Sequence, residues 1–230
     1  SEGLALAYEE NGEISIIEVN SETDFVAKNK DFISFCKEIS EISFKKKGDL
    51  EKIKASGMKN KISVADNLTD LISKIGEKIT LTRSRYFDKK KGNNFYYVHG
   101  AIEKNIGKII SIVKIENIIK GKNEDIGNKL AMHIAASSPL AISKDDLKKE
   151  VLEKELEIIK AELLNSGKKK EMIEKISQGK LNKFISENTL LNQIWIMDPK
   201  KKVLDILKEN SINSELKVLD YIRYKVGEGV

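Results

Sequence analysis

The sequence predicts an α+β fold made of two related units, each with a three-stranded antiparallel sheet and helices, and an antiparallel helical hairpin inserted into the second unit. The main observation is an internal repeat: residues 14–19 read ISIIEV, and residues 110–115 read ISIVKI. Each of these strand-like segments is followed by a helix-like segment of similar apolar spacing, at residues 31–43 and 125–137. A repeat of this length predicts two copies of one structural unit.

The first copy contains two further strands. LALAY at 4–8 precedes the repeated strand, and Asn11-Gly12 between them is a strong signal for a two-residue hairpin turn. A helix is expected at about 64–77, and KITLTRSRYF at 78–87 follows as the third strand.

The second copy has the same order of elements. FYYVHG at 95–100 is the first strand, followed by a looser turn at 104–107. A helix at about 201–210 leads into a third strand at 215–226. Both copies are therefore expected to contain strand, strand, helix, helix and strand, with the helices covering one face of the sheet.

The second copy carries an extra segment, residues 141–190. Leu152, Leu156, Ile159 and Leu163 step by four, three and four, which is the spacing of a coiled-coil seam. The apolar residues of a second helix are expected to face back toward this seam: Met172, Ile173, Ile176, Leu181, Phe184 and Ile185. The pattern predicts a helical hairpin, with local packing and self-association or partner contact as open alternatives for its apolar surface.

These patterns also predict the domain organisation. We expect one core subdomain at 1–93, a second formed by 94–140 and 191–230, and the hairpin module at 141–190.

Composition limits the class of protein. Hydrophobic residues make up 40% and charged residues 33% of 230, as in globular proteins. No apolar run reaches the roughly 18–20 residues of a membrane helix, and no signal peptide is visible after Ser1, so we expect no membrane association and a cytoplasmic location. Cys36 is the only cysteine and is expected to be a buried core residue. With His99 and His133 as the only histidines, we expect no zinc site or other metal site, and no cofactor.

The net charge of +5 raises the possibility of nucleic-acid binding. Much of the excess lies in four triple-lysine runs, which begin at residues 45, 89, 168 and 200. Because they lie near turns or helix ends and lack interleaved aromatic residues, we expect solvated loops and no direct nucleic-acid contact. A basic RNA-binding accessory protein of translation stays as the alternative. A hydrolase is disfavoured because no nucleophile-elbow or triad motif occurs.

One segment identifies a family. Residues 19–28 read VNSETDFVAK directly after a predicted strand, and this resembles the signature of the elongation factor Ts family. Three further stretches resemble the same family: 74–77 (KIGE), 130–137 (LAMHIAAS) and 226–229 (VGEG). The resemblance extends over essentially the whole chain, although no stretch matches the family's N-terminal helical domain.

The resemblance implies a guanine nucleotide exchange factor and not an enzyme. Its expected partner is elongation factor Tu, in the GDP-bound and nucleotide-free states, and the hairpin would be a dimerisation module. Thr23, Asp24, Phe25 and Val26 would bind the partner, with Phe25 entering its G domain and disturbing the Mg²⁺ and phosphate site. The remaining expected contact residues are His99, Ile75, Ile196 and Met197.

The residues themselves allow a different interpretation of the signature. Without the family, Thr23 would be a helix N-cap with Asp24 in the first turn, and Phe25 would be a core residue. The resemblance instead predicts that Phe25 is exposed and that Val26 packs beneath it. His133, between apolar neighbours on a predicted helix, is expected to be a core residue.

Overall fold

The protein consists of two compact units. The computed structural model describes residues 1–230. The first unit comprises Ser1–Ala135 and Lys217–Val230, and the second comprises Ala136–Leu216. Helices accompany two separate antiparallel sheets, so the predicted α+β class is confirmed. The subdomain bounds expected from the sequence stay a prediction.

The first sheet has the strand order β3-β2-β1-β5. Its long strands are β1 (Glu2–Glu10), β2 (Glu13–Ser21) and β3 (Thr80–Phe87). Asn11 and Gly12 both have positive φ angles, 52° and 81°, as the predicted tight hairpin turn requires.

The first sheet also contains a strand that the sequence did not indicate. The segment expected to be only a turn contributes β5 (Ile106–Gly107), which pairs with Ala5 and Leu6 of β1. Ile106 is buried in the core of the first unit, so burial of this side chain explains why the segment joins the sheet.

The second sheet has the three expected strands, in the order β4-β6-β7. These are β4 (Asn93–His99), β6 (Ile109–Glu116) and β7 (Lys217–Lys225). β6 pairs antiparallel with both β4 and β7 and is therefore the central strand of this sheet. In the first sheet, β1 and β2 are the two central strands.

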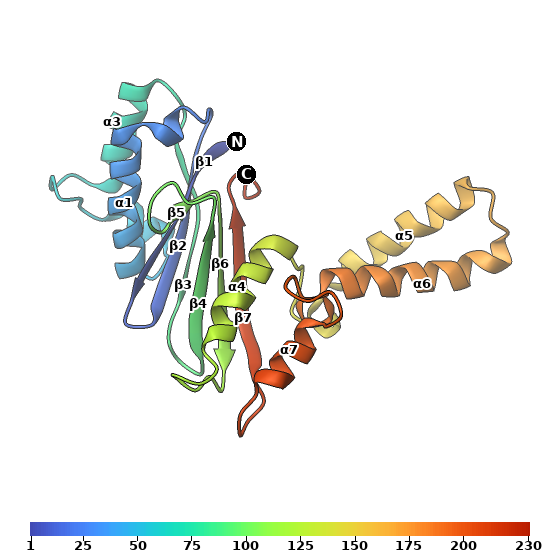
Figure 1. The fold of residues 1–230 in the computed structure, drawn as a ribbon. Coiled ribbons are helices and arrows are strands. Elements are labelled where there is room, and N and C mark those ends of the chain that lie inside the picture. Colours follow the sequence, from blue (N-terminus) through green and yellow to red (C-terminus); the bar gives the residue numbers. More distant parts are fainter. The chain divides into compact units, whose positions relative to one another are not determined.

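The two sheets pack face to face between helices (Figure 1). On β1, Leu4 and Leu6 join the core cluster that also contains residues of α1 (Lys30–Lys45) and α3 (Val64–Ile75). The alternate residues Ala5 and Ala7 join a second cluster, which includes Ile110 and Ile112 of β6. This alternation is the period of two expected of a strand buried on both faces.

Two further helices belong to this layered arrangement. α4 (Asp125–Ser137) contacts the outer side of the second sheet, where the Arg223 side chain donates a hydrogen bond of 2.9 Å to the Ala135 carbonyl. α2 (Leu50–Ala55), a short helix between α1 and α3, buries Ile53. Cys36 in α1 is fully buried, which raises the pKa of its thiol, and His133 in α4 is also fully buried, as expected of core residues.

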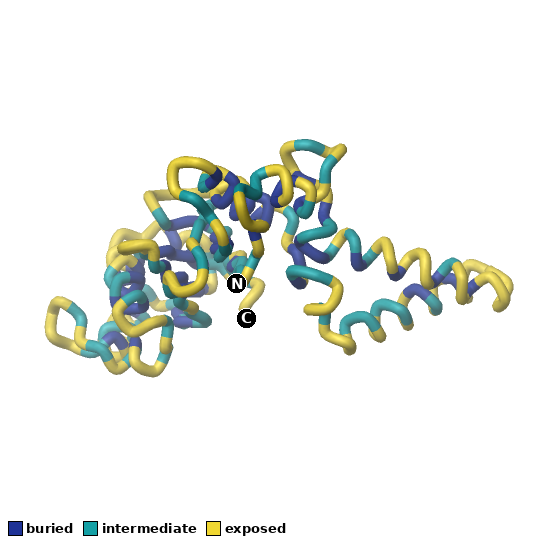
Figure 2. Tube along the Cα trace, turned by 90° about the horizontal axis from the view of Figure 1, so that it is seen from below, coloured by how far each residue is buried: buried dark blue, intermediate teal, exposed yellow.

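The second unit contains the predicted helical hairpin. α5 (Lys149–Asn165) and α6 (Lys170–Asn188) lie side by side and antiparallel (Figure 1). Their buried seam residues are Ile159, Leu163, Ile173, Leu181 and Ile185. Figure 2 shows exposed residues at the tip of the hairpin and buried residues along its inner sides.

Met172 does not face back as predicted. It is 53% exposed, because the adjacent Ile173 takes the buried position in the first turn of α6. The rest of the second unit includes two short 3-10 helices, η2 (Lys144–Asp146) and η3 (Leu190–Asn192), and α7 (Val203–Asn210). Among all the helices, none combines the length and the apolar character that crossing a bilayer requires.

Candidate functional site

The segment Glu22–Phe25, called here the Phe25 loop, connects β2 to the 3-10 helix η1 (Val26–Lys28). Both of its neighbours are anchored, since Ser21 is 3% and Val26 is 4% exposed. Phe25 is 75% exposed, the largest exposed fraction among the large hydrophobic residues. The interpretation of Phe25 as a core residue is therefore wrong, and the exposed position expected from the resemblance is the one observed.

Thr23 is not a helix N-cap. The N-cap of α1 is Asn29, whose side-chain oxygen accepts hydrogen bonds from the amides of Asp31 and Phe32. The polar groups of Thr23 contact Glu77 instead: its amide donates to Oε2 at 3.0 Å and its hydroxyl donates to Oε1 at 2.7 Å. Thr23 cannot cap α1 because this helix begins at Lys30, seven residues after Thr23.

The other residues of the signature differ in exposure. Asp24 is exposed and forms an ion pair with Lys28 at 3.6 Å. Val26 is buried in the core cluster of the first unit, directly after Phe25, as expected. Ile75 is half-buried at the end of α3 and packs against the same cluster. Ile75 thus contributes to the core beneath the Phe25 loop as well as to the surface.

His99 lies at the end of β4, on the second sheet, and is exposed. Its Nδ1 is 3.3 Å from the hydroxyl of Tyr97, and the two rings lie 6.1 Å apart between centroids. The imidazole is therefore accessible, and its position is restrained by one neighbouring side chain.

Ile196 and Met197 lie in the second unit, in the turn between η3 and α7. They are 41% and 44% exposed, whereas Trp195 is 4% exposed and anchors the turn. Ile194 is 61% exposed and was not among the predicted site residues. It borders a pocket of about 390 Å³ within the second unit. The apolar run Ile194–Met197 signals this surface, but the sequence alone does not tell which of its residues points outward.

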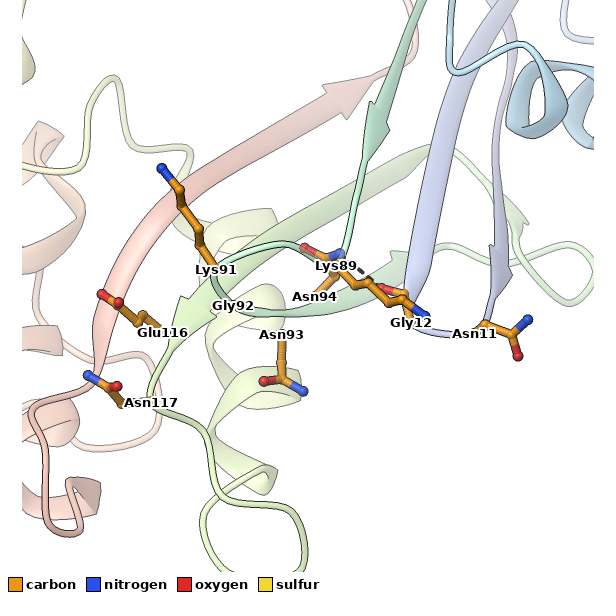
Figure 3. A pocket seen from close by; sticks show the side chains of 9 residues that line it. All are labelled: Asn11, Gly12, Lys89, Lys91, Gly92, Asn93, Asn94, Glu116 and Asn117. Carbon is orange, nitrogen blue, oxygen red and sulfur yellow. Dashed lines mark hydrogen bonds between the residues drawn. The ribbon is translucent and has the colours of Figure 1, made fainter.

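A polar pocket of about 550 Å³ lies near turns of the first unit and contains none of the predicted site residues. It is lined by Asn11, Gly12, Lys89, Lys91, Gly92, Asn93, Asn94, Glu116 and Asn117. Figure 3 shows that the side chains of Lys91 and Asn93 point in different directions. The Asn94 amide donates to the Gly12 carbonyl at 2.9 Å. The lining residues are thus mainly asparagines, glycines and lysines, with Glu116 as the one carboxylate. No group of three or more His, Cys, Asp or Glu side chains in the chain is placed to hold a metal ion.

Comparison with known proteins gives a consistent result. Residues 22–228 match the family model described as Elongation factor TS. The elongation factor Ts of Syntrophotalea carbinolica is 37% identical over 237 residues, covering 100% of this chain and 76% of the relative. That of Rhizorhabdus wittichii is 35% identical over 233 residues, with coverages of 100% and 76%. That of Alkalilimnicola ehrlichii is 37% identical over 215 residues, with coverages of 93% and 68%.

Proposed function

The chain belongs to the elongation factor Ts family, and on that premise we propose that it is a guanine nucleotide exchange factor that binds elongation factor Tu and promotes the release of GDP. It acts by binding and not by making or breaking covalent bonds, so it is not an enzyme. Its place of action is the cytoplasm, where translation factors work.

The observation that supports this proposal most strongly is the exposure of Phe25. An aromatic ring that is 75% exposed on a loop with buried ends is available to another protein. Transfer of a Phe side chain from water to an apolar site contributes about 1.5–3 kcal/mol, and aromatic residues are frequent among the residues that dominate binding energy. Phe25 is the residue that we expect to enter the G domain of the partner, with Asp24 beside it.

The mechanism follows from how such GTPases hold nucleotide. Backbone amides, a lysine and a Mg²⁺ ion bind the phosphates, so displacing the elements that hold the Mg²⁺ weakens GDP binding. Insertion of Phe25 stabilises this disturbed state of the partner. Because the two binding events are linked, the factor weakens GDP binding by the same free energy by which GDP weakens binding of the factor.

Secondary contacts complete the proposal. His99, Ile196 and Met197 are exposed and are proposed to contact the partner, whereas half-buried Ile75 contributes a smaller area. Homodimerisation is proposed to occur through the hairpin at 141–190. Exposed apolar residues of that hairpin are Ile158, Leu164 and Met172.

The direct experiment uses elongation factor Tu loaded with fluorescent GDP. Adding this chain should accelerate the loss of fluorescence, and without nucleotide the two proteins should co-elute in gel filtration. Excess GDP should then dissociate the complex. If release is not accelerated while the chain binds RNA with strong salt dependence, the RNA-binding alternative is correct and the exchange function is wrong.

A further inference from the structure

We propose that Glu77 is a positioning residue of the nucleotide exchange site: it holds Thr23 in place, and thereby fixes the direction in which the Phe25 loop presents its ring. This inference rests on the proposed function only where GDP release is measured. The order of the Phe25 loop is a property of the free chain and can be measured without the partner.

The contacts of Thr23 support this role. The carboxylate of Glu77 accepts two hydrogen bonds from Thr23, one from the amide at 3.0 Å and one from the hydroxyl at 2.7 Å. The carbonyl of Thr23 accepts a third hydrogen bond from the hydroxyl of Ser21 at 2.9 Å. Each polar group of Thr23 therefore has a partner, and two of the three bonds come from one side chain.

A second carboxylate, that of Glu22, binds in the opposite direction, from the Phe25 loop to the segment that contains Glu77. Oε2 of Glu22 accepts a hydrogen bond from the Lys78 amide at 3.1 Å. The last backbone pair between β2 and β3 is Asn20 with Thr80, so the segments 22–23 and 77–78 lie just beyond the end of the ladder. Here the connection between the two chain segments continues as carboxylate-to-amide hydrogen bonds. Hydrogen bonds to charged acceptors are stronger than those between neutral groups.

The residues before Glu77 determine its position. Ile75 is packed against the core, and Gly76 adopts the left-handed conformation with φ of 80° as the C-cap of α3. Gly tolerates this conformation without the steric cost that other residues have. The Ile-Gly-Glu sequence thus supplies, in order, an apolar anchor, a change of chain direction and the carboxylate that binds Thr23.

Loop order matters because Phe25 has little packing of its own. An exposed ring on a mobile loop loses conformational freedom when it binds, and this loss opposes association. A loop that is already ordered avoids most of that cost. Loss of the Glu77 contacts should therefore impair exchange far more than it impairs folding.

The experiment compares Glu77→Ala, Glu77→Gln and a control, Glu51→Ala, which removes an exposed carboxylate on α2. Glu77→Ala should lower the second-order rate constant of stimulated GDP release roughly tenfold, equivalent to about 1.4 kcal/mol. Glu77→Gln keeps one acceptor oxygen and should give an intermediate value, because the amide nitrogen accepts no hydrogen bond. Glu51→Ala should match the wild type, and all three variants should keep near-normal melting temperatures.

Two further readouts separate positioning from direct contact. In the free chain, Glu77→Ala should accelerate hydrogen exchange at the Thr23 amide, and an unchanged rate would refute the proposal whether or not the protein promotes GDP release. In a Phe25→Ala background, Glu77→Ala should have almost no further effect on GDP release, because Glu77 acts through Phe25. An equally large effect in both backgrounds would mean that Glu77 contacts the partner itself. If the wild-type chain does not accelerate GDP release, the proposed function is refuted. Hydrogen exchange at the Thr23 amide would still decide whether Glu77 orders the loop.

Discussion

Two glutamates near the end of β2 accept hydrogen bonds from backbone amides in very different surroundings. Glu77 is partly exposed and binds Thr23 of the Phe25 loop. Glu18 is 0% exposed and accepts from Gly227 at 2.8 Å, from the Asn20 side chain at 2.9 Å and from Arg83 at 2.5 Å. Gly227 follows β7, so Glu18 connects the first sheet to the end of the second.

The burial of each glutamate determines what happens when its side chain is removed. When the fully buried carboxylate of Glu18 is removed, the partly buried Arg83 and the Gly227 amide lose their partner, water replaces it only in part, and stability falls. When the partly exposed carboxylate of Glu77 is removed, water can replace most of the lost hydrogen bonds, and the main expected consequence is a less ordered loop. The comparison indicates that the network around Glu18 maintains the fold, whereas we propose that the network around Glu77 orders the Phe25 loop for a partner.

The largest effect is expected for Glu18→Ala. Removing one partner of a buried ion pair costs about 3–5 kcal/mol. Because the Arg83 side chain that is left behind is 27% exposed, we expect a loss at the lower end of this range, about 3 kcal/mol, in the free energy of unfolding measured by urea denaturation. Glu51→Ala serves as the matched control. GDP release per folded molecule should stay near the wild-type value, and a stability loss below about 1 kcal/mol would contradict the difference drawn between the two networks.

A smaller effect concerns pH and Tyr224, which lies in the same interior region. Burial raises the pKa of its hydroxyl to about 12, although the Arg83 guanidinium, 4.1 Å from the ring centre, favours the charged form. The folded pKa lies above the usual value of about 10, so the contribution to stability is complete below pH ~10 and is lost as pH rises toward ~12.

The measurement is urea unfolding at several pH values in this window. Wild type should lose about 1–3 kcal/mol more than Tyr224→Phe, which has no hydroxyl to ionise. The pKa of Tyr86 is also raised to about 12, mainly by burial, so part of the alkaline loss should persist in the variant. Identical pH profiles for the two proteins would contradict the assignment to Tyr224.

The smallest effect on stability is expected for Asp24→Ala. Its ion pair with Lys28 is exposed at both ends, and such pairs contribute less than about 1 kcal/mol. The melting temperature should hardly change, while stimulated GDP release should fall less than in Phe25→Ala. Lys28→Ala is the control for the ion pair: if it reduces release as much as Asp24→Ala does, the pair matters rather than the carboxylate.

Much of the fold could be predicted from the sequence because each copy of the repeat has a regular local pattern. The pattern ISIIEV and its copy placed β2 and β6, and the heptad spacing placed the hairpin. β5 was missed because two residues carry no recognisable period. Met172 was misplaced because a shift of one position in the first turn of a helix changes the face that a residue occupies.

The site was less accessible to sequence reasoning. Periodicity and capping rules favoured a buried Phe25 and an N-capping Thr23, and only the family resemblance indicated an exposed ring. The stretch 74–77 carried the family resemblance, but the contact of Glu77 with Thr23 could not be predicted. The two residues lie 54 positions apart along the chain and meet only after β2 and β3 pair. Contacts of this kind depend on tertiary structure and leave no local pattern.

Phe25→Ala tests the central claim most directly, that this exposed ring acts on a partner and not on the fold. Ile62→Ala, which truncates another exposed apolar side chain of the first unit, is the matched control. We predict that both variants unfold within about 0.5 kcal/mol of the wild type, and that only Phe25→Ala markedly slows the release of GDP from elongation factor Tu. A loss of about 3–5 kcal/mol in stability, with GDP release by the folded fraction unchanged, would contradict the account.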